Sequence, residues 1–139
     1  MDTVSPARLY ALVVGATLVV AGIIGFLYNA SFAVGSAVER DAVLGLLDVN
    51  GWHNVVHLAT GALGLVLARS AARAYALGLG AVYVLVFVLG LIVGDGGELL
   101  GLIPINTPDN VLHLLLGVTG LAAGFATRGH AVPAARTAS

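Results

Sequence analysis

Four long apolar stretches, almost free of charge, constrain this chain more than any other feature. A helix needs about 20 apolar residues to cross the roughly 30 Å hydrocarbon core of a bilayer. Each stretch reaches or approaches that length, although the second and fourth open with polar residues. The stretches cover residues 9–28, 52–68, 74–94 and 108–127. We therefore expect an all-α integral membrane protein folded as a four-helix bundle.

The composition excludes several other classes of protein. Only 9% of the 139 residues are charged, and the mean hydropathy is +1.02, whereas soluble domains are about one-quarter charged. The net charge of -1 argues against a nucleic-acid partner held by phosphate neutralisation. The absence of cysteine excludes disulfides, thiolate metal sites and iron–sulfur clusters. The sequence contains no phosphate-binding glycine loop and no activated nucleophile, so no motif indicates an enzyme. The apolar composition makes the lipid bilayer the expected partner.

Charge sorts by sign between the two sets of stretch ends and predicts the orientation. Five arginines flank one set: Arg8, Arg69, Arg73, Arg128 and Arg136. All the acids in the chain's interior lie at the other set, together with Arg40: Glu39, Asp41, Asp48, Asp95, Glu98 and Asp109. Since arginine is enriched on the cytoplasmic side, we expect a multi-pass protein of the cell membrane with both termini in the cytoplasm.

The connecting segments lead to two further expectations. Residues 1–128 form a single transmembrane domain, and residues 129–139 form a mobile cytoplasmic tail. The long segment 29–51 mixes apolar and charged residues. It is expected to be either a short amphipathic helix at the membrane interface or a partly ordered lid over the bundle.

An internal repeat is the most informative sequence pattern. The motif Asn-x-x-His-Leu-x-x-Gly-x-x-Gly-Leu begins at Asn54 and returns at Asn110, 56 residues later. Another match relates Arg8-Leu-Tyr10 to Arg73-Ala-Tyr75, 65 residues apart. We interpret these matches as a duplicated helical hairpin, with copies over residues 8–68 and 73–127. Each copy has two spans, so the copies share one orientation and form a parallel repeat, with their symmetry axis along the membrane normal.

Each copy carries a polar and small-residue stripe, because positions i, i+3, i+7 and i+10 share a helix face. The stripes are Asn54, His57, Gly61 and Gly64 in the first copy, and Asn110, His113, Gly117 and Gly120 in the second. The glycines predict close helix packing, within the chain or in a homo-oligomer or a complex with another membrane protein. Equal depth in a symmetric bundle would bring the paired Asn and His residues towards each other.

Two interpretations of the polar residues in these stripes remain open. The Asn and His side chains are expected either to form structural hydrogen bonds or to bind a ligand. In the second case, His57 and His113 would hold a divalent metal or a haem iron, and Asp48, Asp109 or His53 could complete a metal shell. His53 is otherwise expected at the outer surface, and Tyr10 and Tyr75 in the inner aromatic belt. Asn50 and Thr107 are the expected N-cap residues of the second and fourth helices.

The doubled motif, with Pro104-Ile-Asn106 and Pro108-Asp-Asn-x-Leu-His before its second copy, resembles domain of unknown function 4383. The resemblance extends from about Arg8 to Arg128. It implies a small four-span bacterial membrane protein whose biochemical role is not established. The matching positions are Asn54, His57, Gly61, Asn106, Asp109, Asn110, His113 and Gly117.

These observations together favour a non-enzymatic scaffold or accessory protein whose Asn/His cluster, with Asn106 and Asp109, orders the outer half of the bundle. The alternative is a membrane protein that binds haem or a metal through His57 and His113.

Overall fold

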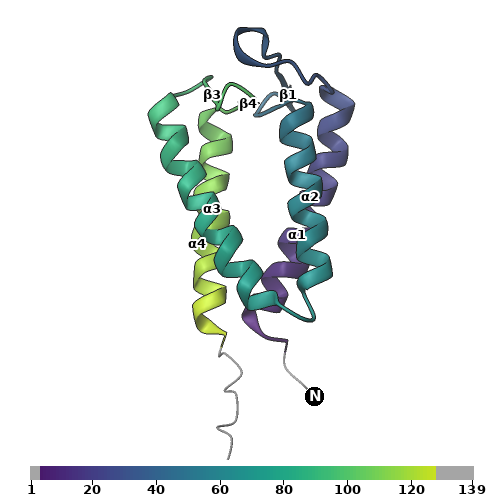
Figure 1. Ribbon diagram of the computed structural model, residues 1–139, viewed down its shortest axis with the longest axis vertical. Coiled ribbons are helices and arrows are strands. Elements are labelled where there is room, and N and C mark those ends of the chain that lie inside the picture. The colour runs from purple at the N-terminus through teal and green to yellow at the C-terminus, as the bar shows by residue number, and fades with distance from the viewer. Residues whose placement is uncertain (1–3, 128–139) are drawn as a thin grey trace, which may run out of the picture.

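Four α-helices dominate this computed structural model, which describes residues 4–127 (Figure 1). Helix α1 (Pro6–Tyr28) packs along α2 (Gly51–Leu67), and α3 (Ala72–Val93) packs along α4 (Thr107–Ala126). The molecule is therefore two helical hairpins standing side by side. The chain enters α1 and leaves α4 at one end, which we call the terminal end. Short strands cover the opposite end, which we call the strand end.

Three of the helices are long and apolar enough to cross a membrane: α1 with 23 residues, α3 with 22 and α4 with 20. Helix α2 has 17 residues and begins with the polar run Trp52-His53-Asn54. The prediction of helices long and apolar enough to span a membrane is confirmed for these three. A crossing by α2 stays a prediction.

The starts of α2 and α4 are determined by asparagine caps. The Asn50 side chain accepts a 3.0 Å hydrogen bond from the His53 amide, as the sequence predicts. The expectation that Thr107 caps α4 is wrong, because Asn106 occupies that position. Asn106 accepts from the Asp109 amide at 3.0 Å, and the Asp109 carboxylate accepts from the Asn106 amide at 3.3 Å, forming a capping box.

Thr107 is instead the first residue of α4, and its amide and hydroxyl both donate to Asp95, at 2.7 and 2.9 Å. The backbone bond, and then the hydroxyl bond, lower the pKa of Asp95 from its ordinary value by stabilising the carboxylate. Asp95 therefore ties the end of α3 to the start of α4.

The amphipathic helix considered for residues 29–51 is wrong. This segment holds a single 3₁₀ turn, Gly35–Ala37, and an antiparallel strand pair. A second, shorter strand pair connects α3 to α4. The pairs are β1 (Asp41–Val43) with β2 (Leu47–Val49), and β3 (Glu98–Leu99) with β4 (Ile103–Pro104).

Both strand pairs turn through Leu-Gly, at Leu44-Gly45 and Leu100-Gly101. The φ angles are 53° and 69° in the first turn, and 54° and 65° in the second. Two consecutive positive φ values fold a chain tightly back on itself. A right-handed helix therefore cannot continue through these positions.

The apolar core lies towards the terminal end and includes the rings of Tyr10 and Tyr75. Both tyrosines are buried, so their expected place in a membrane-surface belt is wrong. Their hydroxyls cross between the hairpins: Tyr10 donates to the Leu116 carbonyl at 2.8 Å, and Tyr75 to the Thr60 carbonyl at 3.0 Å. These bonds give the buried hydroxyls partners, and they join the hairpins on the terminal-end side of His57 and His113.

Polar contacts join the hairpins again at the strand end. Asn50 Nδ2 donates to the Leu102 carbonyl at 2.7 Å, and Asn106 Nδ2 to the Leu46 carbonyl at 2.8 Å. Arg40 adds an exposed ion pair with Glu98 at 2.7 Å. The region between the two joined ends contains the histidines.

The predicted tail at residues 129–139, together with Arg128 and Arg136, lies outside the described residues.

Candidate metal centre

Two of the three histidines near the strand end come from α2. His53 lies in the first turn of the helix and His57 one turn further on, so both project from the same face. Their ring centroids are 4.3 Å apart. The first two turns of α2 therefore present an i, i+4 histidine pair towards the other hairpin.

His113 of α4 completes the group. One ring nitrogen from each of His53, His57 and His113 can be chosen so that all three lie within 4.8 Å of one another. The His113 ring centroid is 6.2 Å from that of His53, and the ring stacks on Tyr83 at 5.3 Å. The fold thus gathers three imidazoles from two helices of different hairpins.

The hydrogen bond of His53 orients its ring for coordination. Its Nδ1 lies 2.8 Å from the Asp48 carbonyl oxygen. Because a carbonyl only accepts, Nδ1 must carry the proton, which leaves the Nε2 lone pair free. A backbone carbonyl that fixes the tautomer in this way is the usual outer partner of a metal-binding histidine.

His113 shows a different feature, an unpartnered polar atom. The residue is 6% exposed, and its Nδ1 has no hydrogen-bond partner within residues 4–127. Leaving a buried polar nitrogen unpaired costs free energy. A bound ion that took this nitrogen would compensate for that cost.

His53 is 3% exposed, so its expected place at the outer surface is wrong. Its other predicted role, completing a metal shell with His57 and His113, agrees with this geometry. The sequence signal was the His53-x-x-x-His57 spacing, because positions i and i+4 share a face. The repeat motif obscures it, since the second copy has Asp109 where the first has His53.

Asp109 is buried and lies near the cluster, but its hydrogen bonds hold the strand end together. Its Oδ2 accepts from the amides of Asp48 at 2.9 Å and Asn106 at 3.3 Å. Asp48 in turn contributes the carbonyl that orients His53. Asn106 and Asp109 therefore position the neighbours of the histidines, and the compact nitrogen group is formed by His53, His57 and His113.

Asn54 and Asn110 do not face each other across the bundle, contrary to expectation. Asn54 packs against Gly25 of α1, and Asn110 against Gly90 of α3. Their side-chain amides donate to main-chain carbonyls, Asn54 to Asn29 at 2.8 Å and Asn110 to Phe87 at 3.2 Å. Each asparagine thus joins the two helices of its own hairpin.

The stripe glycines contact two different kinds of neighbour. A Cβ at Gly61 would lie 2.7 Å from the Gly15 carbonyl, and one at Gly117 would lie 3.1 Å from the Gly80 carbonyl. These two allow close backbone approach inside each hairpin. Gly64 and Gly120 instead leave room for the hydroxyl ends of Tyr75 and Tyr10. The stripe therefore makes contacts both within and between the hairpins.

The cluster lies between two pockets. One of about 330 Å³ opens between α1 and α4, and one of about 70 Å³ lies on the side of α3. All three histidines line both pockets. A metal ion held by three imidazoles would therefore have space for a further ligand on the larger side.

Comparison with known families gives one match. The family described as Domain of unknown function (DUF4383) matches residues 8–126. The chain belongs to this family. The resemblance in the sequence is thereby confirmed, and the matched region includes every residue of the three-histidine cluster. Comparisons with curated proteins and with solved structures return no match.

Proposed function

We propose that this protein binds a divalent transition-metal ion in the membrane, with His53, His57 and His113 as its ligands. The observation that carries the proposal is the approach of three imidazole nitrogens to within 4.8 Å of one another. Neutral imidazole is a preferred ligand of zinc, copper, iron and nickel. Three such ligands with a fourth position open form the usual zinc site that exchanges a water or another molecule.

The cluster needs little rearrangement to coordinate. Zinc–nitrogen bonds of about 2.0–2.1 Å place tetrahedral ligand nitrogens roughly 3.4 Å apart. Movements on the order of 1 Å would bring the rings to that spacing from the 4.8 Å limit. The hydrogen bond from His53 to Asp48 supports coordination through Nε2 without further change.

A small ion suits this group better than haem, the other ligand that the sequence left open. A haem iron takes one or two axial histidines and needs a flat space for its macrocycle. Here the ring of His53 packs against both His57 and His113. A third imidazole in contact with the expected axial pair favours a bare ion.

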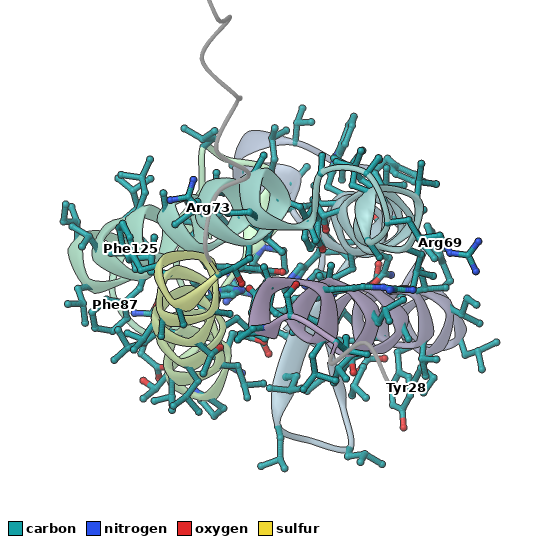
Figure 2. All side chains as sticks on the ribbon, turned by 90° about the horizontal axis from the view of Figure 1, so that it is seen from below. Tyr28, Arg69, Arg73, Phe87 and Phe125 are labelled. Atoms are coloured by element: carbon teal, nitrogen blue, oxygen red, sulfur yellow. The ribbon has the colours of Figure 1, made fainter. Side chains whose placement is uncertain are left out.

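Four membrane crossings, with the termini in the cytoplasm, are part of the same proposal. Arg8, Arg69 and Arg73 lie at the terminal end, where Arg69 points away from the bundle (Figure 2). Asp95 and Glu98 lie at the strand end. This distribution supports a cytoplasmic terminal end, and on that orientation the histidines would lie in the outer half of the membrane.

We also propose that the hairpins are duplicated copies arranged in parallel. Tyr10 bonds to Leu116 as Tyr75 bonds to Thr60, and Asn50 bonds to Leu102 as Asn106 bonds to Leu46. In each case the two donors, and likewise the two acceptors, are separated by the repeat offsets of 65 or 56 residues. Reciprocal contacts of this kind support a two-fold axis between the hairpins.

The test is metal analysis of the detergent-purified protein after incubation with zinc and removal of unbound ion. We expect one zinc per chain, and at least a tenfold weaker affinity in each of His53→Gln, His57→Gln and His113→Gln. His130→Gln is the matched control, because His130 is the only histidine outside the proposed site. Circular dichroism and gel filtration establish that each variant remains folded.

Equal zinc binding by the wild type and the three cluster variants would overturn the metal proposal. Repeating the analysis with iron, copper and nickel identifies the preferred ion. If none of these ions binds and the variants remain folded, the cluster has a structural role. That outcome would favour the scaffold or accessory function predicted from the sequence.

A further inference from the structure

The larger pocket beside the histidines has a polar end and an apolar body. The polar end comes from the first turns of α2 and α4 and includes His53, His57, His113 and Asp109. The remaining lining is aliphatic apart from Thr17, whose hydroxyl bonds to the Val13 carbonyl of its own helix at 2.8 Å. Such a shape suits a molecule with one polar end.

The pocket opens to the side, towards lipid. Val20 and Ile24 of α1 and Leu112 of α4 line the pocket, yet they are 54%, 39% and 42% exposed. Both helices are long and apolar enough to cross a membrane. Their exposed faces therefore meet hydrocarbon, and the pocket can be reached from within the bilayer.

The strand pair β1/β2 covers the pocket at the strand end. Val43, Leu47 and Val49 contribute to its lining. Figure 2 shows this pair reaching past α1 on the side where α4 also lies. The pocket is thus closed towards the strand end and open between the helices, which favours a ligand dissolved in lipid.

The charges at the polar end restrict the ligand further. The lining contains no arginine, and Asp109 is its one acidic residue. The cationic partner of a ligand's head would therefore be the bound ion, and the Asp109 carboxylate can accept a hydrogen bond beside it. A neutral hydroxyl can donate a hydrogen bond, and its oxygen can occupy the open position of a metal ion.

We propose that this pocket binds a lipid-dissolved molecule with a hydroxyl head, of the alkylphenol type, and directs the hydroxyl to the three-histidine centre. The volume of about 330 Å³ lies at the small end of the range for ligand pockets, which suits one ring and the first carbons of an alkyl chain whose remainder extends through the side opening into lipid. This inference rests on the proposed metal site, because the bound ion is the partner of the hydroxyl.

The test measures binding of 4-nonylphenol to the zinc-loaded protein in nanodiscs by equilibrium dialysis, with empty nanodiscs subtracted. We expect saturable binding of one molecule per chain, and at least tenfold weaker binding of nonylbenzene, which lacks the hydroxyl. Removing the zinc should weaken nonylphenol binding to the level of nonylbenzene.

Ala21→Trp places a large ring in the pocket, because Ala21 is part of its lining. We expect this variant to lose at least tenfold in nonylphenol affinity while retaining one zinc per chain. Ala16→Trp is the matched control on the same helix, since Ala16 is exposed and lines none of the pockets described above.

Equal binding of nonylphenol and nonylbenzene would overturn the inference, because it would indicate that any lipid chain fills the pocket. Equal effects of Ala21→Trp and Ala16→Trp would also overturn it. A chain that binds no metal overturns the proposed function itself. That outcome is recognised separately, because zinc content is measured before any phenol is added.

Discussion

Asn50 caps the start of helix α2 and at the same time donates a 2.7 Å hydrogen bond to the carbonyl of Leu102 in the other hairpin. The same side chain accepts a hydrogen bond from the His53 amide. One residue therefore caps α2, holds the helical turn that carries His53 and joins the two hairpins. Asn50 is 1% exposed, so these hydrogen bonds are shielded from bulk water. The stability of the strand end and the geometry of the histidines are therefore linked.

Replacing Asn50 by alanine should destabilise the protein. The loss combines an N-cap, about 0.5–2 kcal/mol, with a hydrogen bond between the hairpins, about 0.5–1.5 kcal/mol. We expect a decrease of about 1–3 kcal/mol in the free energy of unfolding, measured by denaturant titration in detergent. Glu39→Ala is the control, because Glu39 is exposed and makes no hydrogen bond within residues 4–127. Equal stability of both variants would contradict the dual role of Asn50.

Gly25→Ala and Gly90→Ala should both be destabilising. A Cβ at either position would overlap the side-chain oxygen of the asparagine that packs there, Asn54 or Asn110. Overpacking of this kind costs about 1–3 kcal/mol. Gly78→Ala is the matched control, since its added Cβ would have no heavy atom within 4 Å apart from the local backbone and chain neighbours in α3. It should be neutral or stabilising by up to about 1 kcal/mol through helix propensity. Thermal unfolding of the three variants ranks them directly.

Tyr10→Phe and Tyr75→Phe should have similar effects. Each change removes one hydroxyl bond between the hairpins, to Leu116 or to Thr60, and leaves the ring in place. We expect a loss of about 0.5–1.5 kcal/mol in each variant. Tyr28→Phe is the control, because Tyr28 is 38% exposed and points away from the bundle (Figure 2). A large effect of one variant and none of the other would argue against equivalent hairpins.

Asp95 should give stability that depends on pH. Its pKa is lowered by the two bonds from Thr107, so it contributes stability above its unfolded pKa of about 4. That contribution is lost as the pH falls through the lower pKa of the folded state. Asp95→Asn should therefore unfold at a lower temperature than the wild type at pH 7. The difference should narrow towards pH 3. An equal difference between the variant and the wild type at both pH values would contradict the role assigned to the Asp95 carboxylate.

The proposed orientation can be tested by cysteine labelling, since the natural chain has no cysteine. Leu44 is 80% exposed in the strand-end turn, and Ser70 is exposed between α2 and α3. In intact cells, a membrane-impermeant maleimide should label Leu44→Cys. It should label Ser70→Cys only after the membrane is permeabilised. The reverse pattern would place the histidines in the cytoplasmic half.

The helices could be predicted from the sequence, whereas the strand pairs could not. Long apolar runs such as residues 9–28 and 74–94 produce helices in almost any arrangement, because an unpaired backbone is too costly in lipid. The turns at Leu44 and Leu100 have no such local signal. Leucine rarely adopts a positive φ, and the glycine that follows each leucine was the one indication of a tight turn.

The candidate site was predicted in part. His57 and His113 were identified from the repeat, and His53 was named as one of several residues that could complete a metal shell. The repeat led to a wrong expectation for Asn54 and Asn110, because equal depth does not determine which neighbour a side chain faces. Each asparagine packs against a glycine of its own hairpin.

The sequence by itself determined the apolar helices, the Asn50 cap, the sorting of charge between the ends and the family. These properties depend on residues close together in the chain, whose spacing and polarity act locally. The tertiary structure alone decided that His53, His57 and His113 converge and that an apolar pocket opens beside them. Those properties depend on how each helix is rotated and which helix it faces, and contacts such as Tyr10 with Leu116, far apart in the sequence, establish that arrangement.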